Sequence, residues 1–274
     1  MFRLIERYIQ EYVIWYRMSD VQAPSDDMVK AAETLFDIVE SLEREDGKTV
    51  TAIADDLGYA KSTVHRHLTT LTERGYVVKE ANQYHVGLRF LALGERARNR
   101  DDAYQLAREK VEELATDTKE RAQFIVEEHG DAVYIHRALG DHAVRTDPGI
   151  GKRIPLHATS AGKAILANLP EDRLFDIIEQ TEFSAMTDST ITSVDRLLEE
   201  LEDIQERGYS FNRQENIEGL HAIGVPITNG QGEILGALSV SGPSHRLKGD
   251  WFEEELPDLL LGAANELELN IAYS

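Results

Sequence analysis

The chain of 274 residues contains no cysteine, which excludes disulfide bonds and thiolate metal sites. It also lacks a long uninterrupted apolar run. The most apolar stretch is residues 1–18, and charged residues interrupt it, among them Glu6, Arg7, Glu11 and Arg17. No small-residue cleavage pattern follows, so we do not expect a secretory signal. This stretch is either an amphipathic dimerisation helix or the result of a start codon assigned too early, with Met18 or Met28 as the true start.

Basic side chains are scarce, because 29 Lys and Arg stand against 50 Asp and Glu, for a net charge of −21. The exception is residues 58–100, which hold eight basic and three acidic residues between two acidic flanks. Net charge informs on solubility and surroundings rather than on fold. The acid excess predicts a cytosol of very high salt, as in a halophilic archaeon. The basic island predicts the surface that meets nucleic acid.

Residues 47–86 have the pattern of helix, tight turn, helix and short hairpin, which is the outline of a winged helix-turn-helix. In the second helix, Val64, Leu68 and Leu71 fall on one side at spacings of four and three, and this side is expected to be buried. We predict helices over 28–45, 52–57 and 61–74, and wing strands over 76–79 and 83–86. The predicted DNA contacts are Lys61, Ser62, Thr63, His65, Arg66 and Thr70 on the helix, and Asn82, Gln83 and Tyr84 on the wing.

Among these, Arg66 is the candidate for reading guanine or clamping a phosphate. Lys61, Ser62, Thr63 and Thr70 are expected to bind the DNA backbone and set the register of the helix. The alternative for each residue is an ordinary solvated position on the surface.

Residues 88–103 are predicted to form a linker helix, in which leucines alternate with arginines. This helix is either solvated or lies at a dimer seam with its basic face along the phosphate backbone. Beyond it, helices are predicted over 106–118, 159–168, 171–180, 194–207 and 252–272. Strands are predicted over 121–127, 132–137, 142–146, 209–213, 222–227 and 233–241, with a loop at 147–155.

This mixture predicts an α+β fold with a central antiparallel sheet and helices packed against it. The predicted domains are an N-terminal extension (1–24), a winged helix-turn-helix (25–87), the linker helix (88–103) and an effector-binding domain (104–274).

Two stretches, IPLHATSAGKAILA (154–167) and SFNRQENIEGLHAIGVPITNGQGEILGALSVSGP (210–243), resemble the signatures of the IclR family of transcriptional regulators. The resemblance runs from about Met28 to the C-terminus. It implies a GAF-like effector domain, a dimer or tetramer, and a small-molecule site between the sheet and the helix that begins near Thr159. Carried over by position, the effector-binding residues are Ser160, Ala161, Asn212, Leu220, Ala222, Ser239 and Ser241, with Ala143 and Thr146 as weaker candidates. Some relatives have aspartate at the position of Asn212 and cysteine at that of Ala222, so the ligand stays open.

The residues alone also indicate a pocket. A helix that starts at Thr159 or Ser160 presents backbone N–H groups that can hold an anion. Ser239 and Ser241 are two residues apart and therefore share one face of a strand, where they can bind oxygen atoms of a ligand. The alternatives are simple N-caps and outward-facing serines. The preferred ligand class is a small carboxylate, a sugar or a sugar acid.

Catalytic and metal motifs are weak. The stretch SAGKA (160–164) ends like a phosphate-binding loop, but His157 and Ala164 stand where that motif needs Gly and Ser or Thr. No G-x-S-x-G pattern surrounds Ser160, which argues against an esterase. His136, His157 and His221 could converge on a metal. Because lone histidines are more often structural, we predict no metal and no cofactor.

We therefore predict a cytoplasmic, non-enzymatic transcription regulator that binds a near-palindromic operator as a dimer and responds to a small metabolite. In molar salt, phosphate contacts lose most of their contribution to affinity, so specificity is expected to come from base-edge hydrogen bonds, apolar contacts and dimer symmetry. The alternative is a small-molecule-processing enzyme with an appended winged-helix interaction module. The sequence offers no general base paired with a nucleophile to support it.

Overall fold

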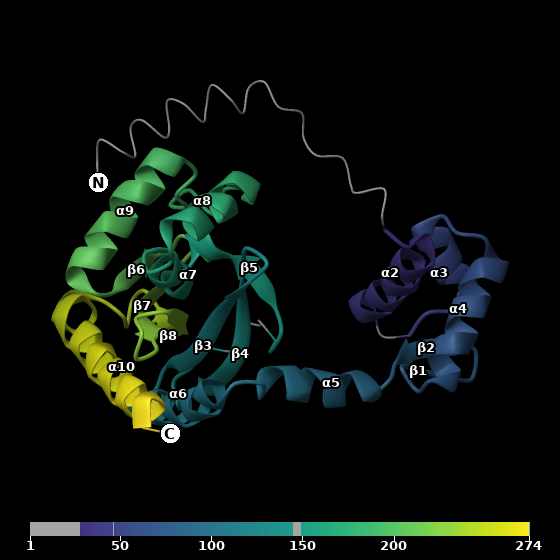
Figure 1. Cartoon of the computed structure of the whole chain (residues 1–274), viewed down its shortest axis with the longest axis horizontal. Helices are drawn as coiled ribbons and strands as arrows, with labels where there is room; N and C mark the ends of the chain where they lie inside the picture. The colour runs from purple at the N-terminus through teal and green to yellow at the C-terminus, as the bar shows by residue number, and fades with distance from the viewer. Residues whose placement is uncertain (1–27, 46, 145–148, 274) are drawn as a thin grey trace. The chain divides into compact units, whose positions relative to one another are not determined.

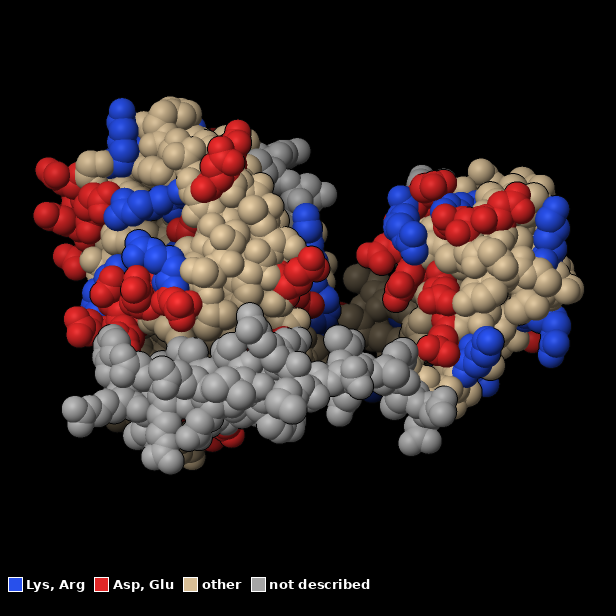
Figure 2. All heavy atoms as spheres, turned by 90° about the horizontal axis from the view of Figure 1, so that it is seen from above, with Lys and Arg blue, Asp and Glu red and all other residues tan. Residues whose placement is uncertain are grey.

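The computed structural model describes residues 28–45, 47–144 and 149–273 (Figure 1). It divides into two compact units, one reaching to Leu93 and the other starting at Gly94. The predictions for residues 1–24 and for Thr146 lie outside the described residues. In the described part of the chain, no helix is long and apolar enough to cross a membrane. On the face seen in Figure 2, acidic side chains occur on both units, and on the second unit several gather at one edge.

In the first unit, the described residues from Lys30 to Val86 form three helices followed by an antiparallel hairpin. The elements are α2 (Lys30–Arg44), α3 (Val50–Leu57), α4 (Lys61–Glu73), β1 (Val77–Glu80) and β2 (Gln83–Val86). Apolar side chains from all three helices meet in one core, with Ile38, Ile53 and Leu68 completely buried. The predicted side of α4, with Val64, Leu68 and Leu71, is the buried one. The winged helix-turn-helix prediction is confirmed.

A partly exposed ion pair links α2 and α3 to strand β2 of the wing. The ammonium of Lys48 lies 2.9 Å from a carboxylate oxygen of Asp56, and the Ser41 hydroxyl donates to the same oxygen at 2.7 Å. The backbone of Lys48 also bridges to Tyr84 of β2. The Ser41 hydrogen bond and the Lys48 ammonium lower the pKa of Asp56, and the carboxylate raises the pKa of Lys48. The contacts of Lys48 and Asp56 thus connect α2, α3 and β2.

The second unit is built on a six-stranded antiparallel sheet with the order β5-β4-β3-β8-β7-β6. Its strands are β3 (Arg121–Glu128), β4 (Asp131–Leu139), β5 (Arg153–Pro155), β6 (Ser210–Arg213), β7 (Leu220–Thr228) and β8 (Ile234–Pro243). Its helices are α5 (Arg89–Arg98), which spans the division between the units, α6 (Asp102–Thr118), α7 (Ser160–Leu166), α8 (Glu171–Gln180), α9 (Val194–Arg207) and α10 (Leu256–Tyr273). A 3-10 turn (Leu156–Ala158) precedes α7, and a π-helical turn (Trp251–Glu255) precedes α10.

Helices cover both faces of this sheet, and each face has its own core (Figure 1). Helices α6 and α10 pack on one face, and α7, α8 and α9 on the other. Strand β8 shows the alternation, because Leu238 and Val240 point to the first core while Ala237 points to the second. The predicted α+β class, with a central antiparallel sheet between helices, is confirmed.

One predicted strand was wrong. Residues 142–144, the described part of the predicted strand 142–146, form a turn and a loop, in which the amide of His142 donates to the carbonyl of Lys119 at 2.8 Å. The strand at this edge is β5, inside the region predicted as a loop, where Ile154 is buried and pairs with Ala132 of β4. A short edge strand with a single buried apolar residue has too little periodicity to be recognised in a sequence.

The predicted linker helix also differs from the structure. Helix α5 ends at Arg98, and a new helix, α6, begins at Asp102. The carboxylate of Asp101 accepts the amide of Ala103 at 2.9 Å and so caps α6. The predicted domain start at residue 104 therefore falls within the first turn of α6.

We predict that Gly224→Ala lowers the free energy of unfolding of the second unit by about 1–3 kcal/mol, as expected for overpacking. A Cβ at this position of β7 would lie 2.6 Å from the carbonyl carbon of Ser160 and 2.7 Å from the amide nitrogen of Ala161, so α7 would have to move. Urea unfolding followed by circular dichroism measures the change. Gly230→Ala is the matched control, because nothing lies within 4 Å of its added Cβ. Equal stability of the two variants would contradict the prediction.

Candidate functional site

The exposed face of α4 carries the predicted DNA contacts. Lys61, Ser62, His65, Arg66 and Thr70 are exposed, and Thr63 is half-buried. A shallow groove runs beside them, lined by Ala31, Thr63, Arg66, His67, Thr69 and Thr70. The hydroxyls of Thr69 and Thr70 donate back to the carbonyls of His65 and Arg66, at 2.9 and 3.2 Å. Their oxygens can still accept, while Arg66 offers the guanidinium donors of this face.

The wing has two of its three predicted contacts on the surface. Asn82 and Gln83 are exposed at the turn between β1 and β2. The third predicted contact, Tyr84, is not on the surface, because it is only 5% exposed and packs in the core of the first unit. Successive residues of a strand point to opposite faces, so an outward Gln83 places Tyr84 inward. Tyr84 therefore stabilises the wing and is not available to DNA.

The arginines near α5 are mostly engaged within the protein. Arg89 donates to the carbonyl of Arg74 and stacks on Tyr76, with its guanidinium carbon 4.8 Å from the ring centre. Arg98 pairs with Glu95 at 2.7 Å, and Arg100 lies 3.4 Å from Glu128. The predicted basic face along the phosphate backbone is therefore weaker than the sequence indicates.

The second unit contains a cavity of about 220 Å³ between the sheet and α7. All seven effector-binding candidates line it: Ser160, Ala161, Asn212, Leu220, Ala222, Ser239 and Ser241. The weaker candidate Ala143 is not among the lining residues; its amide donates to the carbonyl of Gly140. Residues from all six strands of the sheet, from α7 and from the loops between them thus meet at one place.

The charge of the cavity is opposite to that of the whole chain. Among the described residues that line it, Arg121, Lys152 and Arg153 are basic and none is acidic. Arg121 is 4% exposed, and its burial lowers the pKa of the guanidinium, while burial also raises the pKa of the nearby Tyr134 hydroxyl. Arg153 is partly neutralised by Glu128 at 2.7 Å. A small anion is the ligand that this lining favours.

Polar side chains of the sheet complete the lining. The hydroxyls of Ser160 and Ser239 lie 3.2 Å apart. The Ser241 oxygen accepts from Arg121 Nε at 2.9 Å and from Gln123 Nε2 at 3.3 Å, which leaves its own proton to donate elsewhere. The other end of the Gln123 amide is buried and has no hydrogen-bond partner among the described residues. The cavity can therefore bind both a carboxylate and a hydroxyl group.

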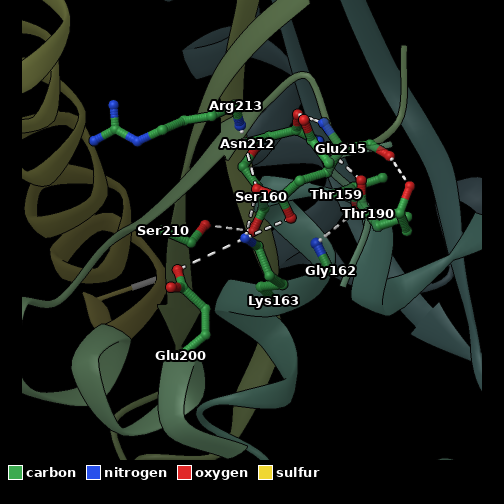
Figure 3. Close-up of polar contacts among 12 residues, drawn as sticks. Thr159, Ser160, Gly162, Lys163, Thr190, Glu200, Ser210, Asn212, Arg213 and Glu215 are labelled. Carbon is green, nitrogen blue, oxygen red and sulfur yellow. Dashed lines mark hydrogen bonds and ion pairs between the residues drawn. The ribbon is translucent and has the colours of Figure 1, made fainter. Parts of the chain in front are cut away.

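Asn212 forms part of the cavity wall but uses its amide for structure (Figure 3). Its Nδ2 donates to the carbonyl of Ala158 at 2.8 Å, and its Oδ1 accepts the amide of Glu215 at 3.0 Å. Thr159 is likewise structural, because its hydroxyl caps the amide of Gly162 at 3.0 Å. The amide of Gly162 is therefore not available to the anion that we predicted to bind at the start of α7.

Sequence reasoning missed Arg121 and Gln123, although it predicted their strand. The signal was present in the alternation Arg121-x-Gln123-x-Ile125, which places two polar side chains on one face of a buried strand. Met186, Asn216 and Ile217 also line the cavity, but they lie in loops without periodicity.

The three histidines weighed as metal ligands lie in different surroundings. His221 bonds through Nδ1 to the carbonyl of Leu247 at 2.7 Å and stacks on Phe252. His157 is buried against Phe183, and burial lowers its pKa. Burial and the charge of Arg98 lower the pKa of His136 on β4. Within the described ranges, no group of three or more His, Asp or Glu side chains could hold a metal ion.

Comparisons with known proteins match both units. The family model "IclR helix-turn-helix domain" matches residues 31–81, and "Bacterial transcriptional regulator IclR C-terminal" matches residues 96–269. The chain is 33% identical over 239 residues to the probable HTH-type transcriptional regulator ArcR of Halobacterium salinarum, covering 86% of this chain and 91% of that protein. It is 32% identical to the regulator KdgR of Escherichia coli, with 90% and 94% covered. The crystal structure of the Thermotoga maritima IclR is similar with a TM-score of 0.73 at 28% identity, covering 89% and 98% of the two chains.

We predict that Asn212→Ala destabilises the second unit by about 1–3 kcal/mol, because it leaves a buried carbonyl and a buried amide without partners. Asn216→Ala is the control, since Asn216 also lines the cavity but its side chain makes no hydrogen bond within the described structure. Its expected effect is within about 0.5 kcal/mol. Denaturant titration of both variants measures the difference. A harmless Asn212→Ala would show that its amide is not a structural link.

Proposed function

Because this chain belongs to the IclR family of transcriptional regulators, we propose that its operator binding through α4 is controlled by a small organic anion held in the cavity of the second unit. The family makes it a DNA-binding regulator with an effector-binding C-terminal domain. We further propose that the protein acts in the cytoplasm as a dimer. The observation that carries it is a cavity with a basic lining in a protein of net charge −21.

The DNA contact is proposed on the exposed side of α4. This side faces away from the core and combines Arg66 and Lys61 with hydroxyl groups, within residues 58–100, where eight basic residues stand against three acidic ones. A helix with this composition fits the major groove, where the guanidinium can bind the acceptor edge of guanine. Asn82 and Gln83 of the wing add contacts to the backbone. A dimer would place two copies of α4 in successive major grooves of a near-palindromic operator.

The effector is proposed to be a hydroxycarboxylic acid, such as a sugar acid. Arg121 and the proton of Ser241 provide donors for a carboxylate. The free end of the Gln123 amide and the paired hydroxyls of Ser160 and Ser239 suit the hydroxyl groups. A neutral sugar would use only the second set and would form no ion pair with the guanidinium of Arg121.

The enzyme alternative finds no support in the cavity. Among its described lining residues there is no His, Asp or Glu to act as a general base. Ser160, the one candidate nucleophile at the start of α7, shares a hydrogen bond with another serine hydroxyl, which does not activate it. Family membership favours the regulator for the same chain.

We predict that Arg66→Ala weakens binding to an operator selected from random DNA by roughly 10- to 100-fold in molar potassium chloride, the loss expected for one bidentate base contact. Fluorescence anisotropy measures the affinity. Arg74→Ala removes the same charge at the other end of α4 and is expected to weaken selected and random DNA alike. If the two variants behave identically, Arg66 contributes only general electrostatics.

We also predict that gluconate raises the thermal midpoint of the second unit in molar potassium chloride, whereas glucose does not. At about 100 times its Kd a ligand adds roughly 2.7 kcal/mol, which corresponds to several degrees for a domain of this size. Arg121→Met should abolish most of the shift, and Arg196→Met, which removes an exposed arginine from α9, should not. Equal shifts for gluconate and glucose, or a shift that survives Arg121→Met, would contradict the proposed ligand class.

A further inference from the structure

Two loops supply part of the lining of the cavity. The loop 214–219, between β6 and β7, supplies Asn216 and Ile217, and the loop between α8 and α9 supplies Met186. Both loops are largely exposed, and each has a single buried residue. These residues are Glu215 in the first loop and Thr190 in the second.

A hydrogen bond joins the two buried residues (Figure 3). The Thr190 hydroxyl donates to the carbonyl of Glu215 at 2.6 Å, and its oxygen accepts the amide of Met186 at 3.0 Å. The Thr187 hydroxyl adds a bond to the carbonyl of Gln214 at 2.7 Å. The Thr190 hydroxyl therefore links the backbone of Met186 to the backbone of Glu215. Asn216, which lines the cavity, directly follows Glu215 in the chain.

The carboxylate of Glu215 connects both loops to helix α7. It lies 2.7 Å from the ammonium of Lys163, whose side chain is only 2% exposed on α7. Glu200 of α9 is farther, at 3.6 Å from the same ammonium, and is itself paired with Arg207 at 2.8 Å. Neither Lys163 nor Glu215 lines the cavity. Lys163 follows the cavity residue Ser160 by three positions on α7.

We propose that the Lys163–Glu215 ion pair is a latch that positions both loops over the cavity and so sets the affinity for the effector without touching it. The proposal rests on the proposed function only in taking the cavity as the effector site. Replacing a buried ion pair by apolar side chains of similar size is often neutral or stabilising, so such a pair contributes geometry more than stability. Salt screens a buried pair much less than a surface pair, so the latch would hold in molar salt.

The latch is tested by hydrogen–deuterium exchange of the full-length Glu215→Gln variant. The variant keeps the size of the side chain but removes the charge that binds Lys163. We expect exchange at least 10-fold faster in peptides covering 184–190 and 213–219, with peptides of α6 and α10 unchanged. Glu199→Gln is the matched control, because it breaks the exposed Arg196–Glu199 pair on α9. It should leave both loops at the parent rate.

Glu215→Gln leaves the buried Lys163 without its charged partner and could prevent folding. In that case the double variant Lys163→Met/Glu215→Met is used, because it removes both charges. It should melt close to the parent temperature and still show fast exchange in both loops, with a Kd for gluconate at least 10-fold higher by calorimetry. Unchanged exchange in the loops, or a uniform increase over the whole domain, would overturn the latch. If the parent does not bind gluconate, the proposed ligand class fails, while the exchange rates still decide whether the latch exists.

Discussion

The first turn of α7 lies directly against the backbone of β7, and the geometry of the cavity depends on this contact. Glycine at 224 leaves no side chain between the strand and the helix, and glycine at 162 lets α7 approach the carbonyl of Leu156. At this distance Ser160 meets Ser239, and Asn212 reaches the backbone before α7. The same approach brings Lys163 to Glu215. A bulkier residue at either glycine would separate all of these pairs together.

Features that depend on periodicity could be predicted from the sequence. The buried side of α4 follows from apolar spacings of three and four, and the shared face of Ser239 and Ser241 follows from the alternation of a strand. The same alternation should have shown that Tyr84 is buried when Gln83 is exposed, and that Arg121 and Gln123 share a face with Ile125. In these cases the signal was available and the residue type misled the interpretation, because a tyrosine on a wing resembles a DNA contact.

Other features had no signal in the sequence. Lys163 and Glu215 are 52 residues apart and meet only because α7 and the loop 214–219 pack on neighbouring elements. Met186 reaches the cavity through hydrogen bonds made by threonines in an irregular loop. The edge strand β5 is three residues long and forms because β4 offers an unpaired edge. Such contacts are decided by tertiary structure, where local patterns carry little information.

Helix α5 carries exposed leucines as well as arginines and has no packed face. It is only ten residues long and has no buried side chain, while Leu88 beside it is 84% exposed and Leu91 is 66% exposed. A helix this short is marginal in water without a packed face. Its own packing therefore gives it little stability. A short helix without packed contacts frays readily, and α5 is the segment in which the chain passes from one unit to the other.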